Sequence, residues 1–421
     1  MQYIWQANQF FMTKRRFLTS LLLLPAAMAF SAGYQINVQG VRQVAMGGTG
    51  CGLAWDASTI FYNPGGLSDL NNWQAYGSIN LLFAQTRYAQ VPTQGLTEDS
   101  KMGVYAPFNV YVGGPLSINN RIGVGLGIYT PFGSGLTWEN NWTGRFVTQS
   151  INLKTVFFQP TVSYKVCDYF SIGGGFIYSM GGVDLKKGIP LQDENAVNGQ
   201  AHLKGNANGM GYNLGAQIRI DDQWQIGISY RSRVNMKVKN GKANFYVPTS
   251  LETNFPNTSF SATLPLPSVT TLGVAFKATD EITLQADFNY IKWSAYKNLE
   301  FDYADNTPIL ADTKSPRYYN DKMSFRLGGH YIFNDKFCLM AGAAYDPTPV
   351  ADGYVSPDLP DANHWIMSGG LTYEFNDHIT FMGAFEYNTT VQRNAQYTPD
   401  NFNGIYQTKV VLPSFGMTYD F

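Results

Sequence analysis

The chain has 421 residues, with 29 basic and 30 acidic side chains, and only 14% of its residues are charged. An ordinary soluble domain carries roughly 25% charged residues. There are 42 glycines, and aromatic residues make up 15% of the chain. A disordered protein would lack the aromatic residues. A net charge of -1 gives no electrostatic basis for nucleic-acid binding, so no nucleic-acid partner is expected. The composition predicts a large all-β protein.

The first residues have the pattern of a secretory signal peptide. Three basic residues precede an apolar run at 17–30, which ends in small residues suited to cleavage before Ala32. We therefore expect residues 1–31 to be removed, and residues 1–11 read as an extension ahead of the true start. A single membrane anchor is the alternative, but the run is short for a span.

The mature chain shows the alternation expected of a transmembrane β-barrel. No later apolar run is long enough for a membrane-spanning helix, which leaves a barrel as the spanning fold. From Ile282 to Tyr290 apolar residues alternate with polar ones, and the segments 224–231 and 414–421 repeat the pattern. Such alternation places one face toward lipid and the other toward the lumen. The terminal Phe421 resembles the signature of bacterial outer-membrane barrels and predicts recognition by the barrel-assembly machinery.

Turn chemistry indicates the number of strands. Short polar breaks suited to tight hairpins occur at Asn119-Asn120, Cys167-Asp168, Asp221-Asp222, Thr279-Asp280, Asn334-Asp335 and Asn376-Asp377. Six hairpins pair twelve strands, and one further strand at each end gives about fourteen, an even number as such barrels require. Intervals rich in Pro, Asp and Asn predict extracellular loops at 188–198, 246–257, 306–316 and 348–363.

The segment 32–71 does not fit the barrel wall. It is rich in glycine, with scattered apolar residues, and precedes the first predicted strand. A fourteen-stranded barrel has a lumen too wide for its own side chains to fill, so we expect this segment to form a plug, or hatch. The predicted organisation is a signal peptide (1–31), an N-terminal hatch (32–71) and a transmembrane antiparallel β-barrel (72–421).

Several motifs resemble the FadL family of outer-membrane transporters. The sequences at 32–37 and 57–67 resemble the family's hatch, and those at 129–133, 142–145 and 344–350 resemble signatures further along its barrel. The resemblance implies a fourteen-stranded barrel with a hatch, integral to the outer membrane of a Gram-negative bacterium. It also implies passive transport of hydrophobic compounds, most of all long-chain fatty acids, with aromatic hydrocarbons as another ligand class.

The predicted third strand is interrupted by Thr130, Pro131, Phe132 and Gly133. A proline removes a donor from the strand ladder and glycine weakens pairing, so we expect a kink. In the FadL family such a kink opens the wall, and the resemblance implies lateral exit of the ligand into the bilayer. This route keeps an apolar chain out of water, and exposure to water would cost about 0.8 kcal/mol per CH₂. The alternative is a bulge that only curves the barrel.

The triplet Asn63, Pro64 and Gly65 resembles the Asn-Pro-Ala motif of the family's hatch, with glycine in place of alanine. The resemblance implies that these residues couple the hatch to the wall. An ordinary Asn-Pro turn is the alternative.

A fatty acid also needs a partner for its carboxylate. Lys186 and Lys187 fall near the place where the family has a basic residue for this group, and Arg145 is a comparable candidate; a solvated pair at a loop edge is the alternative. Bulky aromatic residues near the predicted loops are candidates for an apolar entry groove or for an interfacial aromatic belt. These residues are Trp138, Trp142 and Phe146.

The sequence carries no recognisable catalytic motif, and the spacing of its four histidines offers no metal site. We therefore expect no enzymatic activity, no cofactor and no metal centre. One group of acidic residues suits either a solvated loop or Ca²⁺: Asp346, Asp352, Asp358 and Asp361. A monomer surrounded by outer-membrane lipid is expected. The alternatives to hydrophobic transport are a porin for hydrophilic solutes and a structural or adhesive surface barrel.

Overall fold

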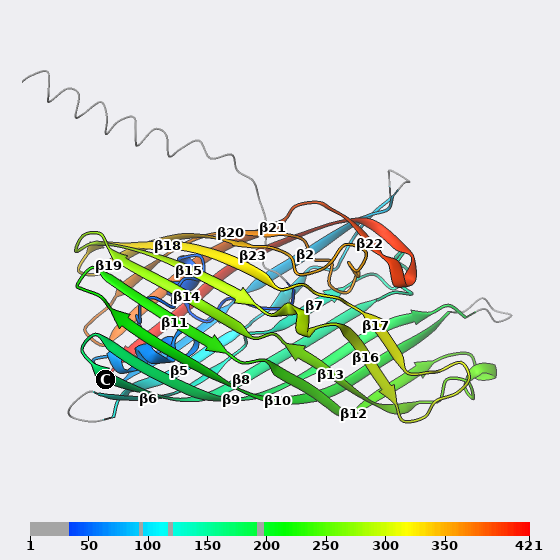
Figure 1. Cartoon of the computed structure of the whole chain (residues 1–421). Helices are drawn as coiled ribbons and strands as arrows, with labels where there is room; N and C mark the ends of the chain where they lie inside the picture. The colour runs from blue at the N-terminus through cyan, green and yellow to red at the C-terminus, as the bar shows by residue number, and fades with distance from the viewer. Residues whose placement is uncertain (1–32, 92–95, 117–120, 192–197) are drawn as a thin grey trace, which may run out of the picture.

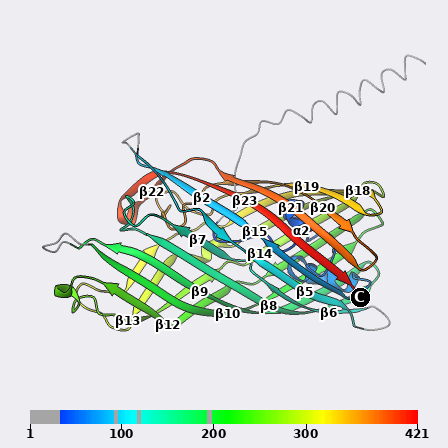
Figure 2. The ribbon, with the colours of Figure 1, turned by 180° about the vertical axis from the view of Figure 1, so that it is seen from behind.

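A closed antiparallel β-barrel dominates the computed structural model, which describes residues 33–91, 96–116, 121–191 and 198–421 (Figure 1). Its strand segments join into 14 strands, as the turn spacing predicted. The first strand pairs with the last, with Gln74 opposite Asp420, and Figure 2 shows β2 alongside β23 where the barrel closes. The predicted signal peptide and the Asn119-Asn120 hairpin lie outside the described residues.

The first half of the barrel consists of segments β1 (Gln74–Asn80), β2 (Leu82–Ala89), β3 (Thr97–Asp99), β4 (Gly103–Tyr105), β5 (Phe108–Pro115), β6 (Ile122–Tyr129), β7 (Gly133–Thr137), β8 (Ser150–Cys167), β9 (Phe170–Ile189), β10 (Gly199–Arg219), β11 (Trp224–Arg231) and β12 (Val234–Tyr246). The second half consists of β13 (Thr258–Leu266), β14 (Val269–Lys277), β15 (Ile282–Ile291), β16 (Asn298–Tyr303), β17 (Thr313–Pro316), β18 (Lys322–Asn334), β19 (Phe337–Asp346), β20 (His364–Glu374), β21 (Ile379–Thr390), β22 (Arg393–Tyr397) and β23 (Phe402–Asp420). The helical turns are α2 (Val41–Ala45), α3 (Thr59–Tyr62), η1 (Pro64–Asp69), η2 (Thr249–Leu251), η3 (Trp293–Ala295) and η4 (Thr398–Asp400).

The described helices are all short, and none has the length and apolar character of a membrane span.

Short hairpins gather at one end of the barrel and longer loops at the other, which we call the hairpin end and the loop end. Five predicted hairpins are confirmed, between β8 and β9, β10 and β11, β14 and β15, β18 and β19, and β20 and β21. One predicted loop is shorter than expected. The interval 306–316 ends in β17, because Lys314 and its neighbours pair with β16.

Inward and outward side chains alternate as predicted. In β15, Thr283, Gln285 and Asp287 are buried, whereas Leu284 and Phe288 are 51% and 48% exposed. The last strand also turns its apolar residues outward, including Phe415 at 55% exposed, and the chain ends at the exposed Phe421. An apolar exterior of this kind is what a hydrocarbon environment requires.

Residues 33–71, which we call the hatch, lie inside the barrel toward the hairpin end (Figure 1). Helix α2 packs against β19, β20, β21 and β23, and η1 packs against β8, β9 and β10. The apolar residues of the hatch are buried at these contacts, among them Val41, Val44, Ile60 and Leu67. The barrel therefore has a filled lumen over this part of its length.

Charged groups of the wall hold the hatch through its backbone. The buried Asp287 carboxylate accepts hydrogen bonds from the N–H groups of Gly50 and Cys51, at 2.9 and 3.0 Å. The Arg326 guanidinium donates to the carbonyl of Gly47 at 3.0 Å. A buried donor or acceptor left without a partner costs about 1 to 3 kcal/mol, and more if charged. These bonds therefore give buried polar groups of the wall and of the hatch backbone a partner.

One glycine tests how closely the hatch fits. A Cβ atom on Gly227 of β11 would lie 1.8 Å from the Cys51 carbonyl oxygen, whereas a Cβ on Gly383 of β21 would meet nothing within 4 Å. We expect Gly227→Ala to displace the hatch and to raise ion conductance in planar bilayers, and Gly383→Ala to leave conductance unchanged. Equal conductance of both variants and the native protein would show that the hatch does not seal the lumen.

Candidate functional site

The third strand of the barrel is broken between β6 and β7. From the Tyr129–Phe157 pair to the Gly133–Lys154 pair, three residues of this strand face two of β8, which is a bulge. On the other side, pairing with the second strand stops after Tyr129, opposite Asn109. The two strands meet again where the Lys101 N–H donates to the Thr137 carbonyl at 2.8 Å. We call the interval between these contacts the wall window.

The start of the hatch pairs with this broken strand. The Ile36 N–H donates to the Pro131 carbonyl, and the Gly133 N–H donates to the Tyr34 carbonyl, each at 2.9 Å. Between these bonds Gln35 forms a β-bridge with Phe132. Backbone groups that the third strand turns away from the second are thus satisfied by the hatch. Of the four residues predicted to form the kink, Thr130, Pro131 and Phe132 lie in the break, and Gly133 begins β7 directly after it.

The triplet Asn63, Pro64 and Gly65 lies between the hatch and the wall. The Asn63 amide nitrogen lies 2.9 Å from both the Ala216 carbonyl oxygen and the Gln217 side-chain oxygen of β10. Its side-chain oxygen accepts a hydrogen bond from the Gly65 N–H at 3.1 Å, which begins η1. All three residues of the triplet are buried. The motif therefore links the turn of the hatch directly to the backbone of one strand.

Two adjoining cavities lie beyond the hatch. The inner cavity, of about 70 Å³, has a mainly apolar lining that includes Val183, Leu185, Met236, Leu264 and Phe301. The window cavity, of about 530 Å³, extends from the hatch past the broken strand. Both cavities are lined by Leu153 and Lys154 of β8 and by Leu359, so they adjoin.

The window cavity passes from the lumen to the outside of the wall. On its inner side it contacts Leu153 and Thr155, and on its outer side Lys154 and Val156 of the same strand. Because successive residues of a strand point to opposite faces, a cavity that contacts all four surrounds the strand edge. The outward residue Val104 of β4, 60% exposed, also lines it.

A buried ion pair closes one end of the inner cavity. Arg317 donates two hydrogen bonds to the Asp358 carboxylate, at 3.0 and 2.9 Å. Burial alone would raise the pKa of Asp358, but pairing with Arg317 lowers it below the ordinary value. Tyr34, Tyr296 and Tyr319 line the same cavity. The cavity thus combines an apolar body with a polar end.

The basic residues predicted to bind a carboxylate lie elsewhere. Lys186 shares the outer face of β9 with Asp184, whereas Lys187 shares the inner face with Leu185. Arg145 places its guanidinium 4.4 Å from the Phe146 ring centre. Neither lysine nor Arg145 belongs to the lining of the two cavities.

Lys154 and Arg317 are the basic residues at the cavities, and sequence reasoning missed both. Lys154 stands in a regularly alternating strand, and the window cavity reaches it beside the break in the opposite strand. Arg317 gains its position from Asp358, 41 residues away. Neither residue stands in a motif that marks it in the sequence.

The predicted entry-groove tryptophans are closed to solvent. Trp138 and Trp142 stack with ring centres 4.2 Å apart and are each 1% exposed. Their indole N–H groups donate to the carbonyls of Pro357 and Thr148, at 3.2 and 2.7 Å. Phe146 lies apart from this stack, against Arg145. In this structure the tryptophans form part of the packed core at the loop end.

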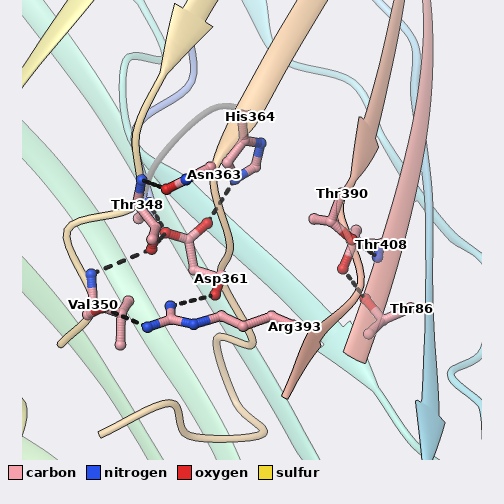
Figure 3. A network of polar contacts seen from close by, with 10 residues as sticks. Thr86, Thr348, Val350, Asp361, Asn363, His364, Thr390, Arg393 and Thr408 are labelled. Carbon is pink, nitrogen blue, oxygen red and sulfur yellow. Dashed lines mark hydrogen bonds and ion pairs between the residues drawn. The ribbon is translucent and has the colours of Figure 1, made fainter. Parts of the chain in front are cut away.

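A polar network surrounds Asp361 in the loop between β19 and β20 (Figure 3), and one hydrogen bond ties the hatch to it. The buried Asp361 carboxylate accepts hydrogen bonds from the Thr348 hydroxyl at 2.5 Å and the Gly33 N–H at 3.2 Å. The His364 ring nitrogen Nε2 lies 2.6 Å from the same carboxylate. Arg393 donates to the Asp361 carbonyl at 3.0 Å. The first described residue of the hatch is therefore tied to this loop.

The four aspartates considered for Ca²⁺ contact different partners. Asp346 pairs with Arg326, Asp358 with Arg317 and Asp352 with Arg393, while Asp361 joins the network above. Over residues 33–91, 96–116, 121–191 and 198–421, no three side chains of the kinds that bind metals come together.

The raised pKa of Asp361 predicts how the stability of the folded protein changes with pH. Burial raises its pKa from 3.8 to about 7, so the folded protein holds a proton that the unfolded chain releases between these values. Binding of this proton stabilises the folded protein at low pH, and this stabilisation is lost as the pH rises. The Asp361→Asn variant cannot bind this proton. We therefore expect the Tm of Asp361→Asn, relative to the Tm of the native protein at the same pH, to increase from pH 5 to pH 8.

The neighbouring Asp352, whose side chain is 99% exposed, provides the control, since Asp352→Asn should show no such trend. A Tm difference for Asp361→Asn that does not change with pH would contradict the prediction.

The closed barrel and its apolar exterior define an integral β-barrel protein of the outer membrane. The family of outer membrane protein transport proteins (OMPP1/FadL/TodX) matches residues 22–421, and the chain belongs to this family.

Relatives agree with this assignment. A putative outer membrane protein of Neisseria meningitidis is 27% identical, over 88% of this chain and 89% of that protein. The long-chain fatty acid transport protein of Salmonella typhi is 25% identical, over 83% of this chain and 86% of that protein. A crystal structure of a Pseudomonas aeruginosa FadL homologue has a TM-score of 0.78 at 22% identity, covering 93% of this chain and 100% of that one. The crystal structure of the P. putida toluene transporter TodX has a TM-score of 0.73 at 16% identity, covering 91% of this chain and 98% of that one. The structural likenesses establish the fold.

Proposed function

We propose that this protein carries long-chain fatty acids, or apolar molecules of similar shape, passively across the outer membrane. The ligand occupies the inner cavity, enters the window cavity and leaves sideways through the wall window into the bilayer. The observation that carries this proposal is a cavity that contacts both faces of β8 beside the broken third strand. Relatives named for fatty-acid and for toluene transport support the apolar ligand class.

Lateral exit agrees with the chemistry of the route. Its walls are mainly apolar, and each methylene kept out of water is worth about 0.8 kcal/mol. The Tyr105 ring lies across the window, since a Cβ atom on Gly135 would come within 2.2 Å of it. Movement of this side chain and of the paired hatch residues 34–36 widens the exit.

The polar head group of a fatty acid lies at the Arg317 end of the inner cavity or beside Lys154 at its junction with the window. Both residues line the apolar space directly. Lys187 and Arg145, nearer the loop end, act on the ligand before it reaches the cavity. Trp138, Trp142 and Phe146 contribute to entry only if the packed loop end opens.

The alternatives fit the structure less well. A hydrophilic porin needs a water-filled channel, but here the hatch is bonded to buried wall charges such as Asp287 and Arg326. A purely structural surface barrel has no need of adjoining apolar cavities. The relatives are transporters, and we propose no catalytic role. The protein acts as a monomer, and its terminal Phe421 presents the assembly signal.

Filling the inner cavity tests ligand binding. Ala207 of β10 lines this cavity, whereas Val162 of β8 is 54% exposed on the outside. We expect Ala207→Phe to weaken binding of a fluorescent long-chain fatty acid about tenfold, since exclusion of two methylenes costs about 1.6 kcal/mol. Val162→Phe adds similar bulk outside and should not change the affinity. Unchanged binding by Ala207→Phe would place the ligand elsewhere.

Repairing the broken strand tests the exit. Deleting Pro131 leaves two residues of the third strand opposite two residues of β8. The third strand can then pair with β8 without a bulge. We expect uptake of radiolabelled fatty acid by cells to fall to background, while the purified protein still binds ligand and reaches the membrane in normal amounts. Pro160→Ala, at a regularly paired position of β8, is the control and should retain uptake. Full uptake after the deletion would exclude the window as the route.

A further inference from the structure

We propose that the outer face of β9, β10 and β12 binds the phosphate groups of a phosphorylated glycolipid in the outer leaflet. The surface consists of five lysines, which we call the lysine patch: Lys186, Lys204, Lys237, Lys239 and Lys242. Its strands lie side by side and reach the loop end of the barrel (Figures 1 and 2).

Strand alternation places these lysines on the outside of the barrel. Lys204 has a side chain 69% exposed, and the preceding Leu203 is buried in the core. Lys237 is exposed between the buried residues Met236 and Val238. The lysine side chains therefore face the membrane surroundings and not the transported ligand.

The five lysines of the patch outnumber the acidic residues of the same three strands. Asp184 is the single acidic residue in β9, β10 and β12, and it is already bonded to His202 at 2.9 Å and to Lys204 at 3.5 Å. Lys204 stands directly opposite Lys242. Like charges opposite each other on one face destabilise a strand pair, so an external anion would relieve this repulsion.

The patch begins where the apolar exterior ends. On β9 the outward residues Ile172, Phe176 and Met180 are about half exposed, and Asn208 of β10 pairs with both Met180 and Lys237. Asp184 and its cross-strand partner Lys204 stand four residues beyond Met180. That separation is about 13 Å along a strand and about 9 Å along the membrane normal for a strand tilted by 45°. This is the depth of lipid head groups.

The combination of charge and depth indicates a lipid and not a free ion. Acyl chains of a lipid pack against Met180, Met210 and Tyr212, all exposed on the same face, while its phosphates lie among the lysines above. Lysine supplies point charges suited to phosphate, and each basic residue near an anionic lipid surface contributes about 1 kcal/mol, or roughly fivefold in binding. On the neighbouring strands β16 and β17, by contrast, Lys314 is paired with Glu300.

Binding of labelled lipid A to the detergent-purified barrel tests the proposal. Bis-phosphorylated lipid A is compared with the same lipid after phosphatase treatment and with inorganic phosphate as competitor. We expect Lys204→Gln/Lys242→Gln to weaken binding of the phosphorylated lipid about 30-fold, at roughly fivefold for each lysine. Lys204→Arg/Lys242→Arg should keep most of the affinity.

Lys277→Gln/Lys336→Gln removes the same charge at the hairpin end and should bind like the native protein. Heat-dependent gel migration shows whether each variant is folded. Three results would overturn the proposal: equal binding of the dephosphorylated lipid, full displacement by equimolar inorganic phosphate, or unchanged affinity of the folded Lys204→Gln/Lys242→Gln variant.

Discussion

Buried polar groups of the barrel lumen require the hatch as their partner, and the other features of the site follow from this requirement. Asp287, Arg326 and Arg231 lie on the inner wall and bond to hatch backbone: Arg231, for example, donates to the Phe61 carbonyl at 2.6 Å. Without the hatch these charges would need water in the lumen. The same contacts fill this part of the barrel, and the two cavities described beyond the hatch have mainly apolar linings.

The hatch also connects the two ends of the proposed route. Residues 34–36 complete the pairing of the broken third strand, and Gly33 is held by Asp361 in the loop between β19 and β20. Tyr34 lines the inner cavity, so a ligand bound there, as we propose, would contact the segment that occupies the window. The proposed route would thus link binding to exit through the hatch.

The sequence predicted the barrel well because strand alternation and hairpin chemistry are local properties. The pattern from Ile282 to Tyr290 and the hairpin at Asp221-Asp222 reappear in the structure. The cavity residues were not predictable in this way. Lys154 borders a cavity because the strand opposite it is broken, and Arg317 meets Asp358 only through the folded barrel. The aromatic side chains of Trp138 and Trp142 suit an apolar groove. In the folded protein the two rings stack on each other within the packed loop end.

Photo-crosslinking with a diazirine-labelled long-chain fatty acid, mapped by mass spectrometry on the membrane-embedded protein, tests the central claim most directly. Passage through the inner cavity and the wall window predicts labels on inner-cavity residues such as Leu264 and on both faces of β8, at Leu153 and at Val156, with competition by unlabelled fatty acid. Labels confined to the lipid-facing exterior, at residues such as Phe176 and Leu284, would contradict a route through the barrel and its wall window.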